Sequence, residues 1–417
     1  MTRLFRPTSV VLALLCLMYF INYLDRVNVS TAAAGFSTEF HLSRTQIGLV
    51  FSAFAYPYLV FQIIGGWVSD RFGTRRTLIV CGLIWACADI LMGLSGGLMS
   101  LLAARVLLGL GEGATFPAAT AAMSRWVTKA RRGFAQGITH AFARIGNALA
   151  PGVIVVIMTN YGWRASFFVC ACFAVAWVVA WALTFTEKPA DHPRITAEEV
   201  AALPIIKSKA AQVPWLRLAR RMAPVTLVYF CYGWNLWLFL SWIPQYFLHS
   251  YDMQIGKSAL FASGVFFAGV VGDTLGGLVT DRLLKTTGNL QLARSVMVAI
   301  CMLLTALSLL PLLFVHDRYV SLACLAAGFF FAEMTIGPMW AVPMDIATDL
   351  CGTASGMMNT GSALAAIISP VVGGYIIDRT GNWELPFAGT MILMLVGAVM
   401  TFRMRPQQRL ELETGIS

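Results

Sequence analysis

Charge is scarce in this sequence: only 12% of its 417 residues are Asp, Glu, Lys or Arg, whereas 58% are hydrophobic. Long polar stretches are also rare, and the apolar runs between them reach the ~20 residues that a helix needs to cross a bilayer. This composition excludes an ordinary soluble globular protein. We therefore expect a membrane protein that crosses the bilayer many times.

Two kinds of functional motif are missing as well. No segment has the form GxxxxGK[ST], so a nucleotide-driven motor is not expected. The cysteines lie almost wholly in apolar runs, without the paired spacing of metal ligands, and are expected to fill the core. They are Cys16, Cys81, Cys87, Cys170, Cys172, Cys231, Cys301, Cys324 and Cys351. We therefore expect no enzyme, no catalytic residue, no metal and no cofactor, and an ion gradient as the energy source.

The apolar runs predict twelve transmembrane helices. They cover roughly residues 9–30, 44–69, 76–96, 98–125, 132–160, 163–186, 223–248, 257–281, 291–314, 318–346, 352–378 and 383–403. Of the 30 Lys and Arg residues, 22 fall on the side that carries both termini, five on the other side and three inside spans. This asymmetry predicts cytoplasmic termini and argues against a nucleic-acid partner. A cleaved signal peptide is the alternative for the N-terminus, but the repeat described below requires the first helix.

The chain reads as two halves joined by a linker. Residues 187–222 form the only long polar segment and separate a six-helix half, 1–186, from a second, 223–403; a tail follows at 404–417. Within the linker, TAEE at Thr196 to Glu199 has capping-box spacing, which predicts a short surface helix.

The two halves share motifs at matching positions. GGWVSDR at 65–71 recurs as GGLVTDR at 276–282, and both halves contain a glutamate followed five residues later by a proline. These pairs are Glu112 with Pro117 and Glu333 with Pro338. Such a repeat predicts an all-α membrane protein with twelve transmembrane helices in two pseudo-symmetric halves around a midplane cavity.

Five ionisable side chains fall inside predicted spans of the first half: Asp25, Arg26, Arg105, Glu112 and Arg144. An unpaired charge in the bilayer costs at least ~2.5 kcal/mol, so we expect these groups to face a wet cavity and one another. A purely structural ion-pair network is the alternative. The rise per residue places Asp25 and Arg26 about 8–10 Å outward of the first helix's centre, at the depth of Arg105. Three guanidinium groups against two carboxyl groups favour an anionic substrate, and the acids can exchange protons.

The segment GGWVSDRFGTRR, at 65–76, resembles the signature of the major facilitator superfamily. NYLDRVNVS, ARVLLGLGEGATFPA and YGWRASF narrow the resemblance to the anion:cation symporter family, over essentially the whole chain. That family includes bacterial proton symporters for galactonate, hexuronates, glucarate, tartrate and phthalate. The resemblance therefore implies a carrier that couples the movement of an organic anion to protons.

The resemblance also implies residue roles. Asp25 and Glu112 would couple protons, and the repeat sets Trp234 and Asn235 opposite the Asp25–Arg26 pair, where they would shape the organic part of the substrate. Arg144 departs from the galactonate carrier, so galactonate is not the expected substrate. The expected substrate-binding set is Tyr23, Arg26, Tyr58, Arg105, Arg144, Trp234, Asn235, Trp340 and Asn359.

A cytoplasmic gate is expected where the two copies of the GG…DR motif end. Gly66 permits close helix approach, and Asp70 can bond basic groups and free amides between the halves, which would favour the outward-facing state. The predicted gate residues are Asp70, Arg71, Arg75, Arg76, Asp281 and Arg282.

Four further polar residues in predicted spans, Asp89, Asp273, Glu333 and His140, are either structural or part of the coupling machinery, and the sequence leaves both interpretations open. The expected function is uptake of a small carboxylate, such as a sugar acid, with protons by a monomer in the bacterial inner membrane. A proton-coupled exporter, a non-transporting nutrient receptor and a channel are the alternatives.

Overall fold

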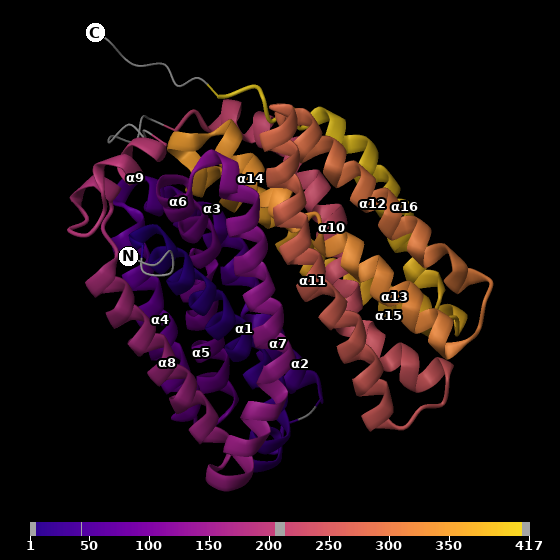
Figure 1. Ribbon diagram of the computed structural model, residues 1–417. Helices are drawn as coiled ribbons and strands as arrows, with labels where there is room; N and C mark the ends of the chain where they lie inside the picture. The colour runs from indigo at the N-terminus through magenta and orange to yellow at the C-terminus, as the bar shows by residue number, and fades with distance from the viewer. Residues whose placement is uncertain (1–5, 43, 205–212, 411–417) are drawn as a thin grey trace. The chain divides into compact units, whose positions relative to one another are not determined.

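The computed structural model describes residues 6–42, 44–204 and 213–410, and all regular elements of these residues are helices (Figure 1). Twelve helical segments among them are long and apolar enough to cross a membrane, which confirms the predicted number. The helices are α1 (Pro7–Glu39), α2 (Arg44–Ala53), α3 (Ala55–Phe72), α4 (Thr74–Gly93), α5 (Leu98–Gly113), α6 (Thr115–Trp126), α7 (Arg132–Tyr161), α8 (Trp163–Thr184), α9 (Ala197–Ala202), α10 (Trp215–Ser250), α11 (Ile255–Thr287), α12 (Met297–Leu309), α13 (Arg318–Glu333), α14 (Ile336–Ile346), α15 (Cys351–Thr380) and α16 (Leu385–Met400).

Three spans are interrupted near a proline, which the sequence ranges did not show. The second span consists of α2 and α3, the fourth of α5 and α6, and the tenth of α13 and α14. Each break lies just before Pro57, Pro117 or Pro338, because proline lacks an N–H and its ring crowds the carbonyl four residues earlier. In the fourth span, the hydroxyl of Thr115 donates to the carbonyl of Glu112 at 2.6 Å and satisfies part of the interrupted backbone.

The first helix is longer than predicted. It runs from Pro7 to Glu39 rather than over 9–30, and the alanines at 32–34 continue it. The middle of this helix falls at residue 23, so Asp25 and Arg26 lie close to its centre. The expectation that they lie about 8–10 Å outward of that centre is therefore wrong, because alanine-rich sequence extends the helix beyond the apolar run.

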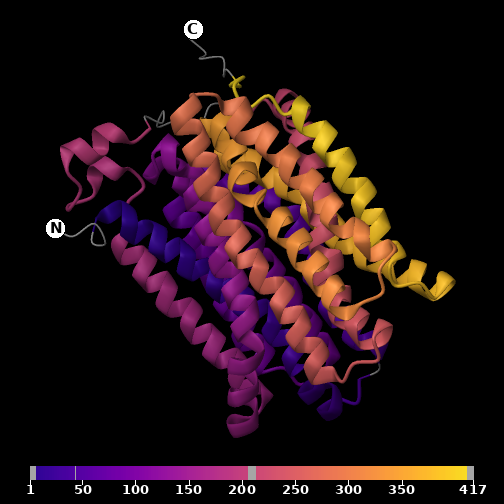
Figure 2. The same cartoon turned by 45° about the vertical axis from the view of Figure 1, so that its right-hand side comes forward.

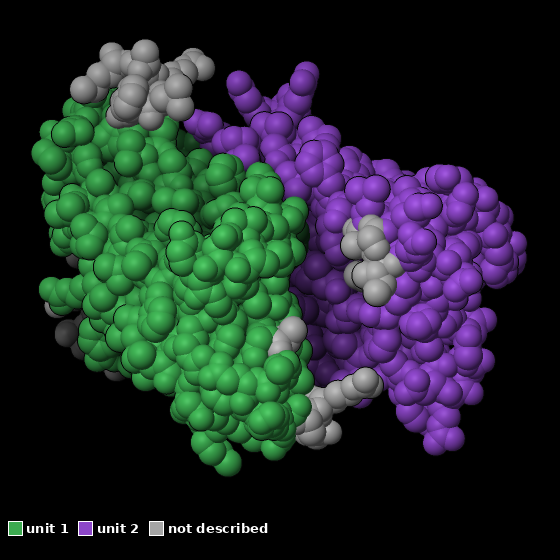
Figure 3. All heavy atoms as spheres, turned by 90° about the horizontal axis from the view of Figure 1, so that it is seen from below, with its two compact units in different colours: residues 1–129, 142–210, 349–356 green, residues 130–141, 211–348, 357–417 purple. Residues whose placement is uncertain are grey.

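The chain divides into two compact units (Figure 3). Unit 1 comprises residues 1–129, 142–210 and 349–356, and unit 2 comprises 130–141, 211–348 and 357–417. In unit 1, α4 packs against α5 and α8, and α1 packs against α8; in unit 2, α11 packs against α13 and α12 against α16 (Figures 1 and 2). The start of α7 thus belongs to unit 2 and the start of α15 to unit 1. The boundaries predicted for the sequence halves remain a prediction.

The linker contains the predicted short helix. Glu199 donates its backbone N–H to the hydroxyl of Thr196, and the Glu199 carboxylate accepts the N–H of Thr196, both at 3.2 Å. This capping box begins α9. Linker residues 205–212 and tail residues 411–417 lie outside the described residues.

Candidate substrate and proton site

A largely buried ion pair joins α1 and α5 in unit 1. Arg26 on α1 donates its Nε–H to Oε2 of Glu112 on α5 at 2.8 Å, and Glu112 is fully buried. The guanidinium carbon lies 4.7–5.3 Å from the centres of four aromatic rings, close enough for cation–π attraction. These rings belong to Tyr23, Phe54, Tyr58 and Phe116. Aromatic side chains therefore surround the pair. The electrostatic attraction between the two charges is stronger in such a low-dielectric setting than in water.

Arg105 lies on α5 two turns before Glu112, and its hydrogen bonds go to backbone oxygens. Its Nε donates to the carbonyl of Val50 at 3.1 Å and its Nη2 to the carbonyl of Phe51 at 3.4 Å. Both carbonyls lie in the last turn of α2, directly before the break at Phe54. Since a break leaves helix carbonyls without their usual amide partners, Arg105 fixes this kink, while its charge also acts on Asp25.

Asp25 and Arg144 complete the predicted cluster. Asp25 is fully buried, and its Oδ2 accepts the indole N–H of Trp85 on α4 at 2.7 Å. The guanidinium of Arg144, on α7, lies 5.7 Å from the ring centre of Tyr23 and is 4% exposed. The structure therefore brings all five predicted charges into one unit, together with Tyr23 and Tyr58.

The cluster keeps unused hydrogen-bonding capacity. Among residues 6–42, 44–204 and 213–410, four of its buried polar atoms have no hydrogen-bond partner: Asp25 Oδ1, Arg26 Nη2, Arg105 Nη1 and Glu112 Oε1. Buried polar atoms are normally satisfied. Two donors and two acceptors are thus in place for a small polar ligand or for protons.

In unit 2, the predicted substrate residue Trp340 is engaged with other side chains. Its indole N–H donates to the hydroxyl of Tyr229 at 2.7 Å, and its ring lies 5.1 Å from that of His140. At the position equivalent to Glu112, both carboxylate oxygens of Glu333 lie 3.0 Å from the Tyr232 hydroxyl. A tyrosine hydroxyl thus contacts Glu333 here, whereas a guanidinium contacts Glu112 in unit 1.

Asn235 is a polar residue of unit 2 with unused hydrogen-bonding capacity. It is fully buried on α10, and neither amide atom has a hydrogen-bond partner within the described part of the chain. Its neighbour Trp234 is partly buried, and Asn359 on α15 is 7% exposed. Their predicted role in binding stays a prediction.

The two motif copies end in matching helix caps. Both oxygens of Asp70 accept backbone amides at the start of α15, from Gly352 at 2.8 Å and Thr353 at 2.7 Å. Asp281 accepts the amides of Gly133 and Phe134 at the start of α7, at 2.9 and 2.7 Å. A carboxylate is favoured there because helix N-termini present free N–H groups and positive potential.

Close backbone packing accompanies these caps. A side chain at Gly66 would overlap the carbonyl oxygen of Gly352, and one at Gly277 would overlap that of Gly133. The expectation that Gly66 permits close approach is therefore confirmed. The predicted gate arginines behave differently, since all of them are exposed at the surface: Arg71, Arg75, Arg76 and Arg282. The side chain of Arg75 donates to the carbonyl of Ala182.

The sequence profile of the Major Facilitator Superfamily matches residues 15–370 and, in a second match, 291–416. The chain belongs to this superfamily. It is 44% identical over 411 residues to a protein of Cupriavidus necator named "Probable sulfoacetate transporter", covering 97% of this chain and 96% of the relative. It is 28% identical to the hexuronate transporter of Bacillus subtilis, over 92% and 91% of the two chains.

Solved structures agree on the superfamily fold. The proton:xylose symporter bound to 6-bromo-6-deoxy-D-glucose matches with a TM-score of 0.79 and 15% identity, over 97% of this chain and 98% of the other. A fucose transporter in the outward conformation matches with a TM-score of 0.72 and 16% identity, over 95% and 99%. The family match and the curated relatives make the chain a multi-pass membrane transporter of the superfamily and not an enzyme.

Some buried residues of this superfamily member were missed from the sequence. Asp345 on α14 accepts Nη1 of Arg132 at 2.8 Å and Nε of Arg294 at 3.0 Å, and both arginines are fully buried. Arg294 lies in a π-helical turn (Leu292–Val296), which re-aims side chains. The sequence places Arg294 at the cytoplasmic end of a span, where exposed arginines are common, so its burial could not be predicted.

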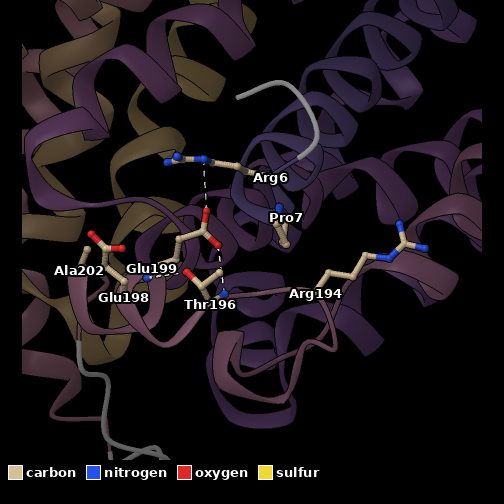
Figure 4. Close-up of a pocket in the computed structure, with 7 residues that line it drawn as sticks. All are labelled: Arg6, Pro7, Arg194, Thr196, Glu198, Glu199 and Ala202. Carbon is tan, nitrogen blue, oxygen red and sulfur yellow. Dashed lines mark hydrogen bonds and ion pairs between the residues drawn. The ribbon is translucent and has the colours of Figure 1, made fainter. Parts of the chain in front are cut away.

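A surface pocket of about 380 Å³ lies between the start of α1 and the linker (Figure 4). Its lining includes an ion pair between Arg6 and Glu199 at 3.6 Å, besides Arg194 and Glu198. Charges of both signs at an exposed position do not resemble the enclosed, arginine-rich cluster around Arg26. The latter is the better candidate for the substrate site.

Proposed function

We propose that this transporter imports a small organic anion together with protons by alternating access. The observation that carries the proposal is the enclosed ion pair between Arg26 and Glu112. Burying a charge pair inside a membrane protein carries a desolvation penalty, so ionisable residues in such places usually have a function. Here it lies beside two further arginines, Arg105 and Arg144, which favour negative charge in the same place.

Competition for Arg26 supplies the coupling. When Glu112 is ionised, it neutralises Arg26 and leaves less attraction for a substrate. When Glu112 takes up a proton, the carboxyl loses its charge and Arg26 becomes available to an anion. Since an unpaired guanidinium is unfavourable in this setting, substrate anion and proton enter together more favourably than either alone.

The names of the relatives guide the choice of substrate. Sulfoacetate and hexuronates are both small organic anions, and the first carries a sulfonate as well as a carboxylate. Planar guanidinium groups bind the oxygens of such groups through parallel hydrogen bonds. We therefore propose a small carboxylate or sulfonated carboxylate as the substrate, with sugar acids retained as candidates.

The surroundings follow from the same proposal. The transporter works as a monomer in the bacterial inner membrane. Both of its termini lie in the cytoplasm, because the basic residues concentrate on the side of the termini. The proton gradient supplies the energy, without a bound cofactor. Trp234, Asn235, Trp340 and Asn359 contact or position the organic part of the substrate.

Uptake into proteoliposomes tests the proposal. Purified protein is reconstituted, an inside-alkaline pH gradient is imposed, and labelled sulfoacetate and glucuronate are offered in separate assays. We expect at least one anion to accumulate and a protonophore to abolish accumulation. Exchange without gradient-driven accumulation would contradict proton coupling, and binding without exchange would indicate a receptor.

A further inference from the structure

Asp89 is a buried carboxyl group that the proposed coupling scheme does not use. It lies on α4 and is fully enclosed. Within residues 6–42, 44–204 and 213–410, no hydrogen-bond donor reaches either of its oxygens. A carboxylate without donors in such a place is strongly disfavoured, because its charge would be neither hydrated nor hydrogen-bonded.

The carboxyl group that Asp89 interacts with directly is Asp25 on α1. Trp85, one helical turn before Asp89 on the same face of α4, holds Asp25 in place through its indole N–H at 2.7 Å. That bond uses Oδ2 of Asp25 and leaves Oδ1 without a donor from the described residues. Oxygens of both carboxyl groups thus lack donors, and a proton held between the two groups would satisfy one oxygen of each.

The remaining groups around Asp89 do not supply that missing donor. The charged and titratable groups that interact with it are Asp25 from α1, Arg105 and Glu112 from α5, and Cys170 from α8. Glu112 is paired with Arg26, and Arg105 directs hydrogen bonds to the carbonyls of α2. Arg26 also acts on Asp25 but is paired with Glu112. Two ionised carboxylates would therefore face only cations that are already engaged, and like charges at close range keep one proton between them.

We propose that Asp25 and Asp89 share one proton and act together as a proton-carrying group of this transporter besides Glu112, with Trp85 as the positioning residue. The inference rests on the proposed proton-coupled function for its role in transport. One proton enters the pair and one leaves it in each cycle, with no change in covalent bonds to other atoms. Asp25 alone is then not the complete coupling site.

Infrared spectroscopy of the full-length protein tests the pair without any substrate. A protonated buried carboxyl group gives a C=O stretching band that is distinct from that of a carboxylate. We expect a component of this band at neutral pH that disappears in both Asp25→Asn and Asp89→Asn, because an amide donor replaces the shared proton. Asp191→Asn, at an exposed linker position, is the matched control and should leave the band unchanged.

The pattern of loss discriminates among the outcomes. A component that survives in Asp89→Asn would place the proton on Asp25 alone, one that survives in Asp25→Asn would place it on Asp89 alone, and its absence from the unmodified protein would exclude a shared proton; each result overturns the proposal. Should the asparagine variants fail to fold, Trp85→Phe retains both carboxyl groups and removes a donor to the charged form. Its band should then persist to higher pH, and an unchanged titration midpoint would also overturn the proposal.

Transport assays connect the pair to coupling. In proteoliposomes, Asp89→Asn should lower gradient-driven accumulation at least tenfold while substrate exchange at equal pH persists. Unimpaired accumulation would show a structural role only and would overturn the proposal. If the unmodified protein shows no proton-driven accumulation, the proposed function fails, whereas the infrared experiment still decides whether the shared proton exists.

Discussion

Arg26 and Glu112 form an ion pair at 2.8 Å although they lie on different helices and 86 positions apart in the sequence. The pair exists because Glu112 lies at the end of α5, next to the break that Pro117 causes, while Arg26 lies close to the centre of α1. Four aromatic rings then surround the guanidinium and limit its contact with water. Protonation of one carboxyl group therefore changes the charge of the whole enclosure.

Glu112→Gln should separate exchange from coupling. The amide is uncharged at every pH and mimics the protonated state, so Arg26 remains available to an anion. We expect substrate exchange to persist, and gradient-driven accumulation in proteoliposomes to fall by at least about tenfold, the effect of losing ~1.4 kcal/mol of coupling free energy.

Glu333→Gln is the matched control, because an amide oxygen can still accept the hydroxyl of Tyr232 that lies at 3.0 Å. We expect it to retain most of the accumulation. A Glu112→Gln protein that concentrates its substrate as well as the unmodified transporter would contradict the proposed role of the pair.

Arg105→Lys should weaken the kink of the second span. A lysine ammonium cannot reproduce the two bonds that the guanidinium directs to the carbonyls of Val50 and Phe51. We expect the free energy of unfolding to fall by about 2 kcal/mol, since hydrogen bonds from charged groups contribute ~1.5–3 kcal/mol each. Thermal unfolding in detergent checks this, with the exposed Arg71→Lys as control; equal melting temperatures would show that the carbonyl contacts do not stabilise the fold.

Much of the architecture could be predicted because it depends on composition and repetition. Apolar runs gave the twelve spans, and the repeat gave Asp70 and Asp281 as matching residues, which the structure places as caps of α15 and α7. The rarity of charge within apolar runs identified the five ionisable residues that unit 1 brings together. These features are local or periodic, so a single sequence carries them.

The pairing of those charges could not be predicted because it depends on helix ends and breaks. A first helix over 9–30 would place Asp25 and Arg26 outward of its centre, whereas α1 continues to Glu39, so both residues lie close to its centre. The break in the second span, which the apolar run does not show, also frees the carbonyls at the end of α2 that accept the hydrogen bonds of Arg105. Trp85 offered one usable signal, because it precedes Asp89 by one helical turn on an otherwise apolar helix.

The two aspartate caps give a paired test of the cytoplasmic contacts. Asp70→Ala removes a carboxylate that accepts two amides at the start of α15, and loss of such a cap costs about 0.5–2 kcal/mol. Asp281→Ala should cost more, because Arg294, fully buried, lies 3.8 Å from Asp281 and would keep only Asp345 as a counterion. The melting temperature should therefore be highest for the exposed control Arg71→Gln, lower for Asp70→Ala and lowest for Asp281→Ala. Any other order would contradict the proposed roles of the two caps.

The break in the fourth span should matter more for transport than for stability. Pro117→Ala restores an N–H and removes a helix interruption that costs ~3 kcal/mol or more in an ordinary helix, so the melting temperature should stay level or rise. A straighter helix would move Glu112 relative to Arg26, and a shift of ~1 Å in a functional group can cost about a hundredfold in rate.

We expect a turnover at least about tenfold lower in proteoliposomes for Pro117→Ala, on that same geometric ground. Pro338→Ala is the matched variant at the break of the tenth span, where Glu333 accepts a tyrosine hydroxyl and the repeat sets Asn235 at the position of Arg26. Its turnover should fall less. Equal losses in the two variants would mean that the breaks serve helix motion in general, and not the placement of the carboxyl group that binds Arg26.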